Sequence, residues 1–327
     1  MTTLAIIGAG IAGRSLIYAL ARSQKNFSEI ILFDSDNFAH ACSLRSTAIV
    51  APRGVTEGHS ELGDLLVAGF QTFSQHVQND LPVGVFPITQ YNGAVTKLEQ
   101  FKKRYPDGIE TKTFASFSLK EEVFLAQEPA YLIDTHLYLQ WLIEKSSGLN
   151  LKLKTDFVTS FSKSEKGIEL RTQNNDCFLF DQVVFCGGSY NQLSHQKKAG
   201  RPVAGSFYEF SDINLNSESF SLTLEGDNFI YHSHSHKILI GSTTSDVIHE
   251  IAPQKKLAEV YLRLQKQLAF QLPPQQKAKV VTGMREKAAK RSPYLLREDN
   301  VAWLGGLYKN GYSLGLHLSL KLLELIH

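Results

Sequence analysis

The chain has 327 residues, of which 43% are hydrophobic and 20% charged, and a formal net charge of +2. This length suits two domains rather than one simple core, and the composition is that of an ordinary soluble globular protein. The charge excludes the strongly basic surface of a typical nucleic-acid-binding protein, and the three widely spaced cysteines exclude a disulfide framework. No run reaches the ~20 apolar residues that span a bilayer. We therefore expect a cytoplasmic protein.

The N-terminal segment carries the pattern of a dinucleotide-binding unit. A short apolar run over residues 4–7 ends abruptly at Gly8 and predicts a buried parallel strand. Gly8, Gly10 and Gly13 have the G-x-G-x-x-G spacing and lead into a helix predicted over residues 15–22. The first glycine permits a tight turn, the second lets the backbone approach a pyrophosphate, and the third lets the helix pack close to the strand.

The next apolar run ends in an acidic residue. Residues 30–33 predict a second strand, and Asp34 stands at its end. An acid at this position accepts hydrogen bonds from a ribose hydroxyl pair, whereas a 2′-phosphate calls for arginine. The pattern therefore favours FAD or NAD over NADP.

A small polar stretch over residues 43–52 follows, and its hydroxyls and Arg45 either line a cofactor or belong to a solvated loop. Helical spacing of apolar residues predicts a helix over 61–77. Residues 82–95 predict a strand pair, with Asn92-Gly93 as the hairpin turn.

The rest of the chain alternates predicted strands and helices. Residues 149–154, 155–161 and 168–172 predict a three-stranded meander. A strand over 180–185 runs into Gly187 and Gly188, which places bare backbone beside a ligand. Further strands are predicted over 130–133, 207–210, 220–224, 229–232, 238–240 and 301–304, and further helices over 98–105, 136–146, 255–272 and 314–326.

Three histidines alternate along one stretch. His232, His234 and His236 would share one face of a strand, with Asp246 or His249 as a further metal ligand. No cysteine or H-E-x-x-H motif supports this, so we predict no metal site. No G-x-S-x-G elbow indicates a serine hydrolase either.

Taken together, the chain resembles the FAD-dependent D-amino-acid oxidase, glycine oxidase and sarcosine oxidase superfamily. The blocks that carry the resemblance occur in the family order: 8–13 with Asp34, 43–52, 133–136, 183–188 with 201–205, 283–285 with Pro293, and 304–312. The C-terminal section is also similar to the oxidase domain of the bifunctional enzyme that completes wobble-uridine modification in tRNA.

The resemblance implies an α/β fold. A Rossmann-like FAD-binding domain of the glutathione-reductase type would be interleaved with a mixed-sheet α+β substrate domain. The FAD-binding domain would comprise residues 1–80, 131–205 and 283–327. The substrate domain would comprise 81–130 and 206–282.

The resemblance also implies which residues bind FAD. Gly8, Gly10, Ala12 and Gly13 match the pyrophosphate turn, and Asp34 matches the acid that binds the ribose. Ser43, Arg45, Ser46 and Thr47 match the loop along the cofactor, and the Val158 backbone matches the adenine contact. The remaining predicted cofactor contacts are Gly187, Gly188, Gly306, Asn310, Gly311 and Tyr312, the last four over the pyrimidine edge of the flavin.

For the substrate, Arg285 matches the arginine that binds the substrate carboxylate with two parallel donors. Tyr308 and Tyr312 are lesser candidates, and no general base is required. On its own, Arg285 would also fit a surface residue in a basic stretch. Residues 288–292 lack the acid and glycine usual before the family proline, and Tyr308-Lys309 replaces smaller residues.

The implied reaction moves hydride from the α-carbon of an amine or amino acid to flavin N5, giving an imine that water hydrolyses. Oxygen or another acceptor would then reoxidise the flavin. Alternatives are oxidation of a modified tRNA uridine, which the charge disfavours, and a flavin-binding protein without amine turnover. An NAD-dependent dehydrogenase fits the fingerprint but not residues 305–312. We expect no membrane partner and no nucleic acid.

Overall fold

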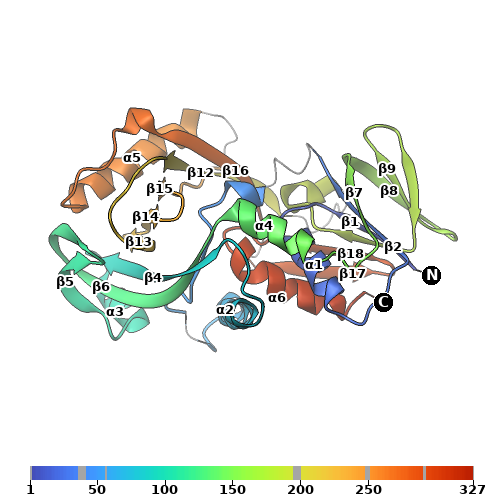
Figure 1. Cartoon of the computed structure of the whole chain (residues 1–327), viewed down its shortest axis with the longest axis horizontal. Helices are drawn as coiled ribbons and strands as arrows, with labels where there is room; N and C mark the ends of the chain where they lie inside the picture. The colour runs from blue at the N-terminus through green and yellow to red at the C-terminus, as the bar shows by residue number, and fades with distance from the viewer. Residues whose placement is uncertain are drawn as a thin grey trace.

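The computed structural model describes residues 2–35, 42–55, 57–193, 200–246, 251–289 and 292–326. The described residues form three sheets of six, three and nine strands. Figure 1 shows the two larger sheets at opposite ends of an elongated molecule, with both chain termini beside the six-stranded sheet. No described helix is both long enough and apolar enough to cross a membrane.

The six-stranded sheet has the order β17-β18-β11-β1-β2-β7, and all its pairings are parallel except that of the edge strand β17. Its apolar strands are buried on both faces, as parallel strands usually are. The strands are β1 (Thr3–Ile7), β2 (Glu29–Asp34), β7 (Leu151–Thr155), β11 (Gln182–Phe185), β17 (Tyr294–Glu298) and β18 (Val301–Gly305).

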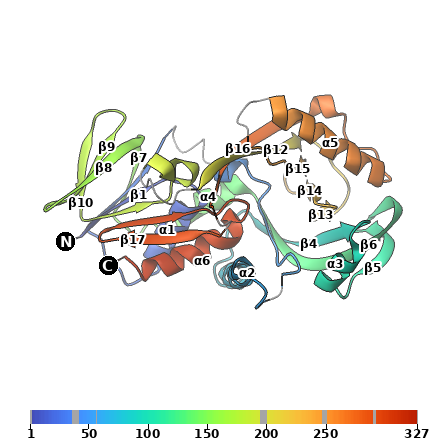
Figure 2. The ribbon, with the colours of Figure 1, turned by 180° about the vertical axis from the view of Figure 1, so that it is seen from behind.

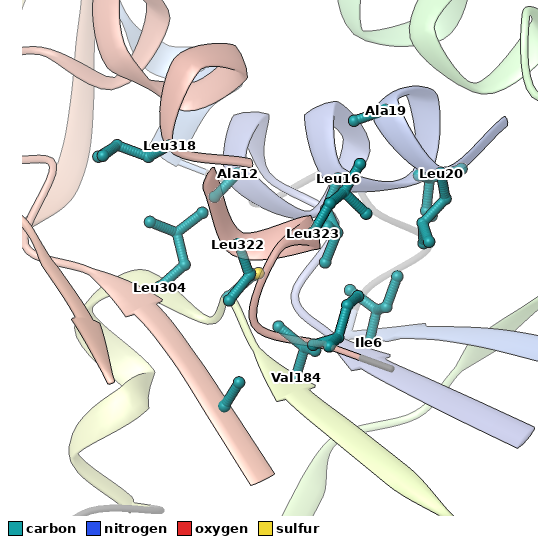
Figure 3. Close-up of a cluster of buried hydrophobic side chains, with 14 of the residues drawn as sticks. Ile6, Ala12, Leu16, Ala19, Leu20, Val184, Leu304, Leu318, Leu322 and Leu323 are labelled. Atoms are coloured by element: carbon teal, nitrogen blue, oxygen red, sulfur yellow. The ribbon is translucent and has the colours of Figure 1, made fainter. Parts of the chain in front are cut away.

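Alternate residues of β1 pack on opposite faces of this sheet. Leu4 and Ile6 contact helices α1 (Ile11–Ala21) and α6 (Gly311–Leu323) in one core, which Figure 3 shows around Leu16, Val184, Leu318 and Leu322. Ala5 faces the other way, against the three-stranded sheet of β8 (Val158–Ser164), β9 (Gly167–Thr172) and β10 (Cys177–Phe180). Strand β1 is therefore buried on both faces and lies in the interior of the six-stranded sheet.

The nine-stranded sheet runs β16-β12-β15-β14-β13-β4-β6-β3, with β5 paired to β6. Helix α5 (Ile251–Gln267) lies beside this sheet, as Figure 2 shows from behind. Its Leu257, Val260 and Leu264 pack into the hydrophobic core on one face of the sheet. The strands are β3 (Ile49–Val50), β4 (Val85–Ala94), β5 (Ile109–Phe114), β6 (Phe117–Ile133), β12 (Arg201–Phe210), β13 (Phe220–Leu224), β14 (Asp227–His232), β15 (Lys237–Gly241) and β16 (Lys279–Lys287).

Three further helices and three short 3₁₀ turns connect these sheets. Helix α4 packs beside α1, and α2 packs against α6. The helices are α2 (Glu61–Asp80), α3 (Leu98–Arg104) and α4 (Thr135–Glu144), and the turns are η2 (Cys42–Arg45), η3 (Gly188–Leu193) and η4 (Gln275–Lys277). Asp134 caps the start of α4, since its side chain accepts hydrogen bonds from the backbone N–H groups of His136 and Leu137.

The predicted domain boundaries stay a prediction. Residues 201–205 and 283–287, which the sequence places in the FAD-binding domain, pair with each other as β12 and β16 of the nine-stranded sheet. The boundary predicted between the FAD-binding domain and the substrate domain thus falls within two paired strands, β12 and β16.

The predicted hairpin at Asn92-Gly93 is wrong. Strand β4 continues through both residues and pairs with β6 and β13. Asn92 donates a hydrogen bond from its side chain to Glu128, and a Cβ on Gly93 would overlap with Leu224. Asn92 and Gly93 are therefore required for contacts inside a strand. The Asn-Gly turn signal considers only these two residues and does not detect such contacts.

The predicted meander is wrong in its first strand. β7 pairs parallel with β2 in the six-stranded sheet, and the meander consists of β8, β9 and β10. Local alternation predicts a strand but not its partner, which here lies more than a hundred residues away along the chain.

Gly69 fixes the crossing of helices α2 and α6. It is buried, and a Cβ would overlap with the backbone carbonyl of Ser313. We expect Gly69→Ala to lower the free energy of unfolding by about 1–3 kcal/mol, because the helices would have to separate. Gly148→Ala is the control, since a Cβ there meets nothing within 4 Å. Urea denaturation of both variants measures the effect, and equal stabilities would contradict this account.

Candidate active site

A pocket of about 470 Å³ lies where the six-stranded sheet meets the nine-stranded sheet. The ends of β1, β2, β11 and β18 line one side, through residues such as Gly8, Asp34 and Gly187. Strands β4, β13 and β16 line the other, through residues such as Asn92, Thr223 and Arg285. Ligands of open α/β sheets bind outside the carboxyl ends of the parallel strands, so this is the expected position for a cofactor.

The glycine turn after β1 is built on close backbone contacts. Gly8 has a φ of +104°, and a Cβ there would lie 2.6 Å from the carbonyl oxygen of Cys186. A Cβ on Gly13 would overlap with the carbonyl oxygen of Gly8. Helix α1 therefore begins at Ile11, four residues before the predicted start, and its N-terminus faces the pocket. The geometry suits a bound pyrophosphate.

The small polar stretch over residues 43–52, the hydroxyl-rich loop, contacts the N-terminus of α1. Ser43 accepts a hydrogen bond from the backbone N–H of Ile11 through its Oγ, at 2.9 Å. Ser43, Ser46 and Thr47 all line the pocket. The loop is therefore part of the pocket wall, which favours the cofactor interpretation of this stretch over the solvated loop.

Asp34 is held in place by backbone donors. Its carboxylate accepts hydrogen bonds from the N–H of Ala9 at 2.6 Å and of Ser35 at 2.7 Å. Beside it, Arg14 donates to the carbonyl oxygens of Ala9 and Leu139, and burial lowers the pKa of its guanidinium although the carboxylate of Asp34 opposes this. The turn and the acid thus form one rigid unit at the strand ends.

Glu286 is a pocket residue that the sequence analysis missed. Its carboxylate accepts hydrogen bonds from the N–H of Gly306 at 2.8 Å and from the Tyr294 hydroxyl at 2.6 Å. Burial raises the pKa of this carboxyl, and the hydrogen bonds oppose the rise. Because Gly306 has a φ of +70°, Glu286 supports a turn that most side chains would strain. The available signal was an acid directly after the block at 283–285.

Helix α6 begins at Gly311, three residues before the predicted start. Gly311 and Tyr312 line the pocket, and within the described residues no side chain caps this helix end. Its first N–H groups are therefore open to an anionic or electron-rich ligand group. The Tyr312 hydroxyl donates to the carbonyl oxygen of Ser43 at 2.8 Å, so it joins the helix to the hydroxyl-rich loop.

Arg285 lies on β16 with its side chain half-buried in the same pocket. Its Nη1 donates to the carbonyl oxygen of Thr243 at 3.4 Å, and its guanidinium lies against the backbone of Gly205. Burial lowers the pKa of the guanidinium, which nonetheless stays protonated. Tyr308, also in the pocket wall, donates to Thr244 at 3.4 Å. Arg285 therefore keeps donors for a ligand.

The pocket brings together most of the residues predicted from the sequence. Among the described residues, Gly13, Arg45 and Asn310 do not line it. Gly13 lies beneath the turn, and Asn310 accepts a hydrogen bond from Arg53 at 3.2 Å. The predicted residues that line the pocket are Gly8, Gly10, Ala12, Asp34, Ser43, Ser46, Thr47, Val158, Gly187, Gly188, Arg285, Gly306, Tyr308, Gly311 and Tyr312.

The sequence analysis also missed the polar wall on the nine-stranded sheet. Gln90 donates to Thr223 at 3.1 Å, Thr223 donates to Asn228 at 2.7 Å, and all three line the pocket. Nearby, Glu128 accepts hydrogen bonds from Asn92 and from the backbone N–H of Arg53, each at 3.0 Å. These residues come from four separate segments, so no local motif indicates the wall.

The histidine stretch does not lie along one strand. His232 ends β14, while His234 and His236 lie in the turn that follows, with the His234 ring stacked on Phe86. His249, the suggested further ligand, lies outside the described residues. Within the described part of the chain, no group of three histidine, cysteine or acidic side chains could hold a metal ion.

A glycine turn and an acid at the ends of parallel strands, with two helix N-termini directed into one pocket, define a dinucleotide-binding protein. The model of the FAD dependent oxidoreductase family (DAO) matches residues 3–322. The chain belongs to this family, so its cofactor is FAD and it is an FAD-dependent oxidoreductase. The expected family, cofactor and α/β fold are confirmed, while the role of each predicted site residue stays a prediction.

Solved structures with this fold include three oxidases. Iminodiacetate oxidase from Chelativorans sp. BNC1 is 17% identical with a TM-score of 0.78, covering 99% of this chain and 96% of that one. Glycine oxidase from Geobacillus kaustophilus is 14% identical with a TM-score of 0.79, covering 99% and 95%. FAD-bound L-alpha-glycerophosphate oxidase from Mycoplasma pneumoniae is 16% identical with a TM-score of 0.79, covering 100% and 95%. No curated protein matches the sequence itself.

Asp34 provides a test of the FAD site. We expect Asp34→Ala to weaken FAD binding about tenfold or more, because a charged acceptor for the ribose is lost and the N–H of Ala9 loses its partner. Asp176→Ala, which breaks an exposed ion pair with Lys154, is the control and should retain FAD as the parent does. Fluorescence titration of the apoprotein with FAD measures both. Equal affinities would exclude the ribose role.

His232 provides a test of pH dependence. Burial lowers the pKa of His232 to about 4, and its Nε2 has no hydrogen-bond partner among the described residues. Between pH 6.5 and 4 the unfolded chain therefore binds a proton that the folded chain does not, so stability falls as the pH falls. We expect His232→Gln to reduce the loss of unfolding free energy between pH 7.5 and pH 5 by about 1–3 kcal/mol. Urea denaturation at pH 7.5 and 5 measures it, with exposed His59→Gln as control. Parallel slopes would contradict the assignment.

Proposed function

We propose that this FAD-dependent oxidoreductase oxidises a C–N bond of an amine or amino acid. One observation carries the proposal: Arg285 lies in the same pocket as the glycine turn and the α6 N-terminus. A half-buried arginine with free donors suits a carboxylate beside the reacting carbon. The names of two proteins of similar structure, iminodiacetate oxidase and glycine oxidase, support a substrate of this kind.

FAD, when bound, would supply the acceptor for the hydride that leaves the α-carbon. Arg285 binds the substrate carboxylate through two parallel donors and so fixes the position of that carbon. Tyr308 lies on the same wall and excludes water beside it. The first N–H groups of α6 stabilise negative charge that develops on the cofactor side of the pocket.

The protein supplies no obligatory base in this scheme. A neutral amine gives up hydride directly, and the imine that results is hydrolysed by water after release. Oxygen or another acceptor then completes the cycle. The enzyme's contribution is therefore binding, orientation and desolvation.

The test is the visible spectrum of the purified protein under anaerobic conditions, before and after addition of amines and amino acids. We expect the flavin absorption to bleach with at least one class of amine. A yellow protein that no amine bleaches would contradict the proposal and favour a flavin-binding protein without amine turnover, or a tRNA substrate.

Arg285 makes the proposal specific. We expect Arg285→Met to raise the amine concentration needed for half-maximal flavin reduction by about 100-fold, because a charged, two-donor contact is lost. Arg285→Lys should recover part of that loss. Arg171→Met, on the exposed face of β9, is the matched control. Stopped-flow reduction measures all three with FAD content held equal. An unchanged concentration dependence in Arg285→Met would exclude the role.

A further inference from the structure

Four basic residues line the pocket: Arg53, Arg104, Arg285 and Lys309. We call Arg53, Arg285 and Lys309 the cationic face, and all three line the pocket. They come from the loop after β3, from β16, and from the loop between β18 and α6. Within the described residues none of them forms an ion pair with a carboxylate. Three positive charges therefore face one pocket with little direct compensation.

The acidic residues nearby are already engaged. Glu128 is the acid with the largest electrostatic effect on Arg53. It accepts hydrogen bonds from Asn92 and from two backbone N–H groups. Glu286 is bound to Tyr294 and to the N–H of Gly306. Glu128 therefore offsets one charge of the cationic face at most, and the face retains a net positive charge.

Lys309 shows the resulting repulsion. Lys309 is an exposed residue, but many protein atoms lie around its side chain. Burial lowers the pKa of its ammonium, and the positive charges of Arg285, Arg53 and Lys287 lower it further. An anion placed among these groups would relieve the repulsion and raise the pKa of the Lys309 ammonium back toward its ordinary value.

A single carboxylate cannot use the whole cationic face. A carboxylate bound by both donors of Arg285 uses one lone pair of each oxygen in that contact, which fixes its position beside Arg285. Arg53 lies on a different segment and is fixed by Asn310, while Lys309 interacts electrostatically with both arginines. On the same side of the pocket, Gln90 and Thr223 present amide and hydroxyl groups rather than an apolar surface. Both features suit a second polar, charged group on the substrate.

We propose that the substrate is an amine with two anionic groups, of which one carboxylate binds Arg285 and the second anionic group binds Lys309 and Arg53. The position of the first carboxylate rests on the proposed function. The second group is a carboxylate or a phosphonate, since both have the oxygen acceptors that lysine and arginine bind.

Binding without turnover tests this proposal. The FAD-loaded enzyme is titrated with malonate, succinate and glutarate, and with the monocarboxylates propionate, butyrate and valerate, while the flavin absorption is followed. We expect the best dicarboxylate to bind about tenfold more tightly than its matched monocarboxylate at low salt. Phosphonoacetate and 3-phosphonopropionate distinguish the two kinds of second group. Equal affinities, or no binding of any dianion, would overturn the proposal.

Two lysine variants locate the second group. Lys309→Gln should lower the preference for dicarboxylates about tenfold while leaving monocarboxylate affinity nearly unchanged. Lys287→Gln removes a neighbouring charge that does not line the pocket among the described residues, and should retain the preference. Equal losses in the two variants would overturn the assignment to Lys309. Dicarboxylate preference without flavin reduction by any amine would contradict the proposed function alone.

Discussion

The contact of Gly13 with the carbonyl oxygen of Gly8 is the constraint on which the rest of the site depends. It lets α1 begin directly after the turn and press against β1, so that the helix N-terminus and the strand end face the same space. The Ala9 N–H then reaches Asp34, and the Ile11 N–H reaches Ser43. Any side chain at position 13 would force the helix away from the sheet, and these contacts would separate with it.

The second half of the pocket depends on β12 and β16, which are long enough to reach from the nine-stranded sheet to the glycine turns. Their pairing continues through nine residue pairs, from Arg201 with Lys287 to Glu209 with Lys279. Adjacent residues of β16 take different roles because a strand alternates its side chains. Arg285 lines the pocket where we propose that substrate binds, whereas Glu286 accepts a hydrogen bond from the N–H of the Gly306 turn. One strand thus orients both the substrate region and the cofactor region.

The sequence predicts features whose cause is local. The glycine spacing and the acid at the end of β2 depend on neighbours within a few residues, and the structure has both. It does not predict features that depend on distant partners. Asn92-Gly93 imitates a turn because its packing partners, Glu128 and Leu224, are remote in sequence. The cationic face was missed for the same reason, since its members carry no common motif.

Helix α6 has a consequence for the order in which the protein matures. Its residues are the last of the described fold to be synthesised, yet Leu318 and Leu322 complete the core beneath β1, and its first turn closes the pocket. A nascent chain that has made only the glycine turn and Asp34 therefore lacks both the packing and the helix end that a flavin needs. We therefore expect FAD to bind only after α6 has been synthesised and has packed beneath β1.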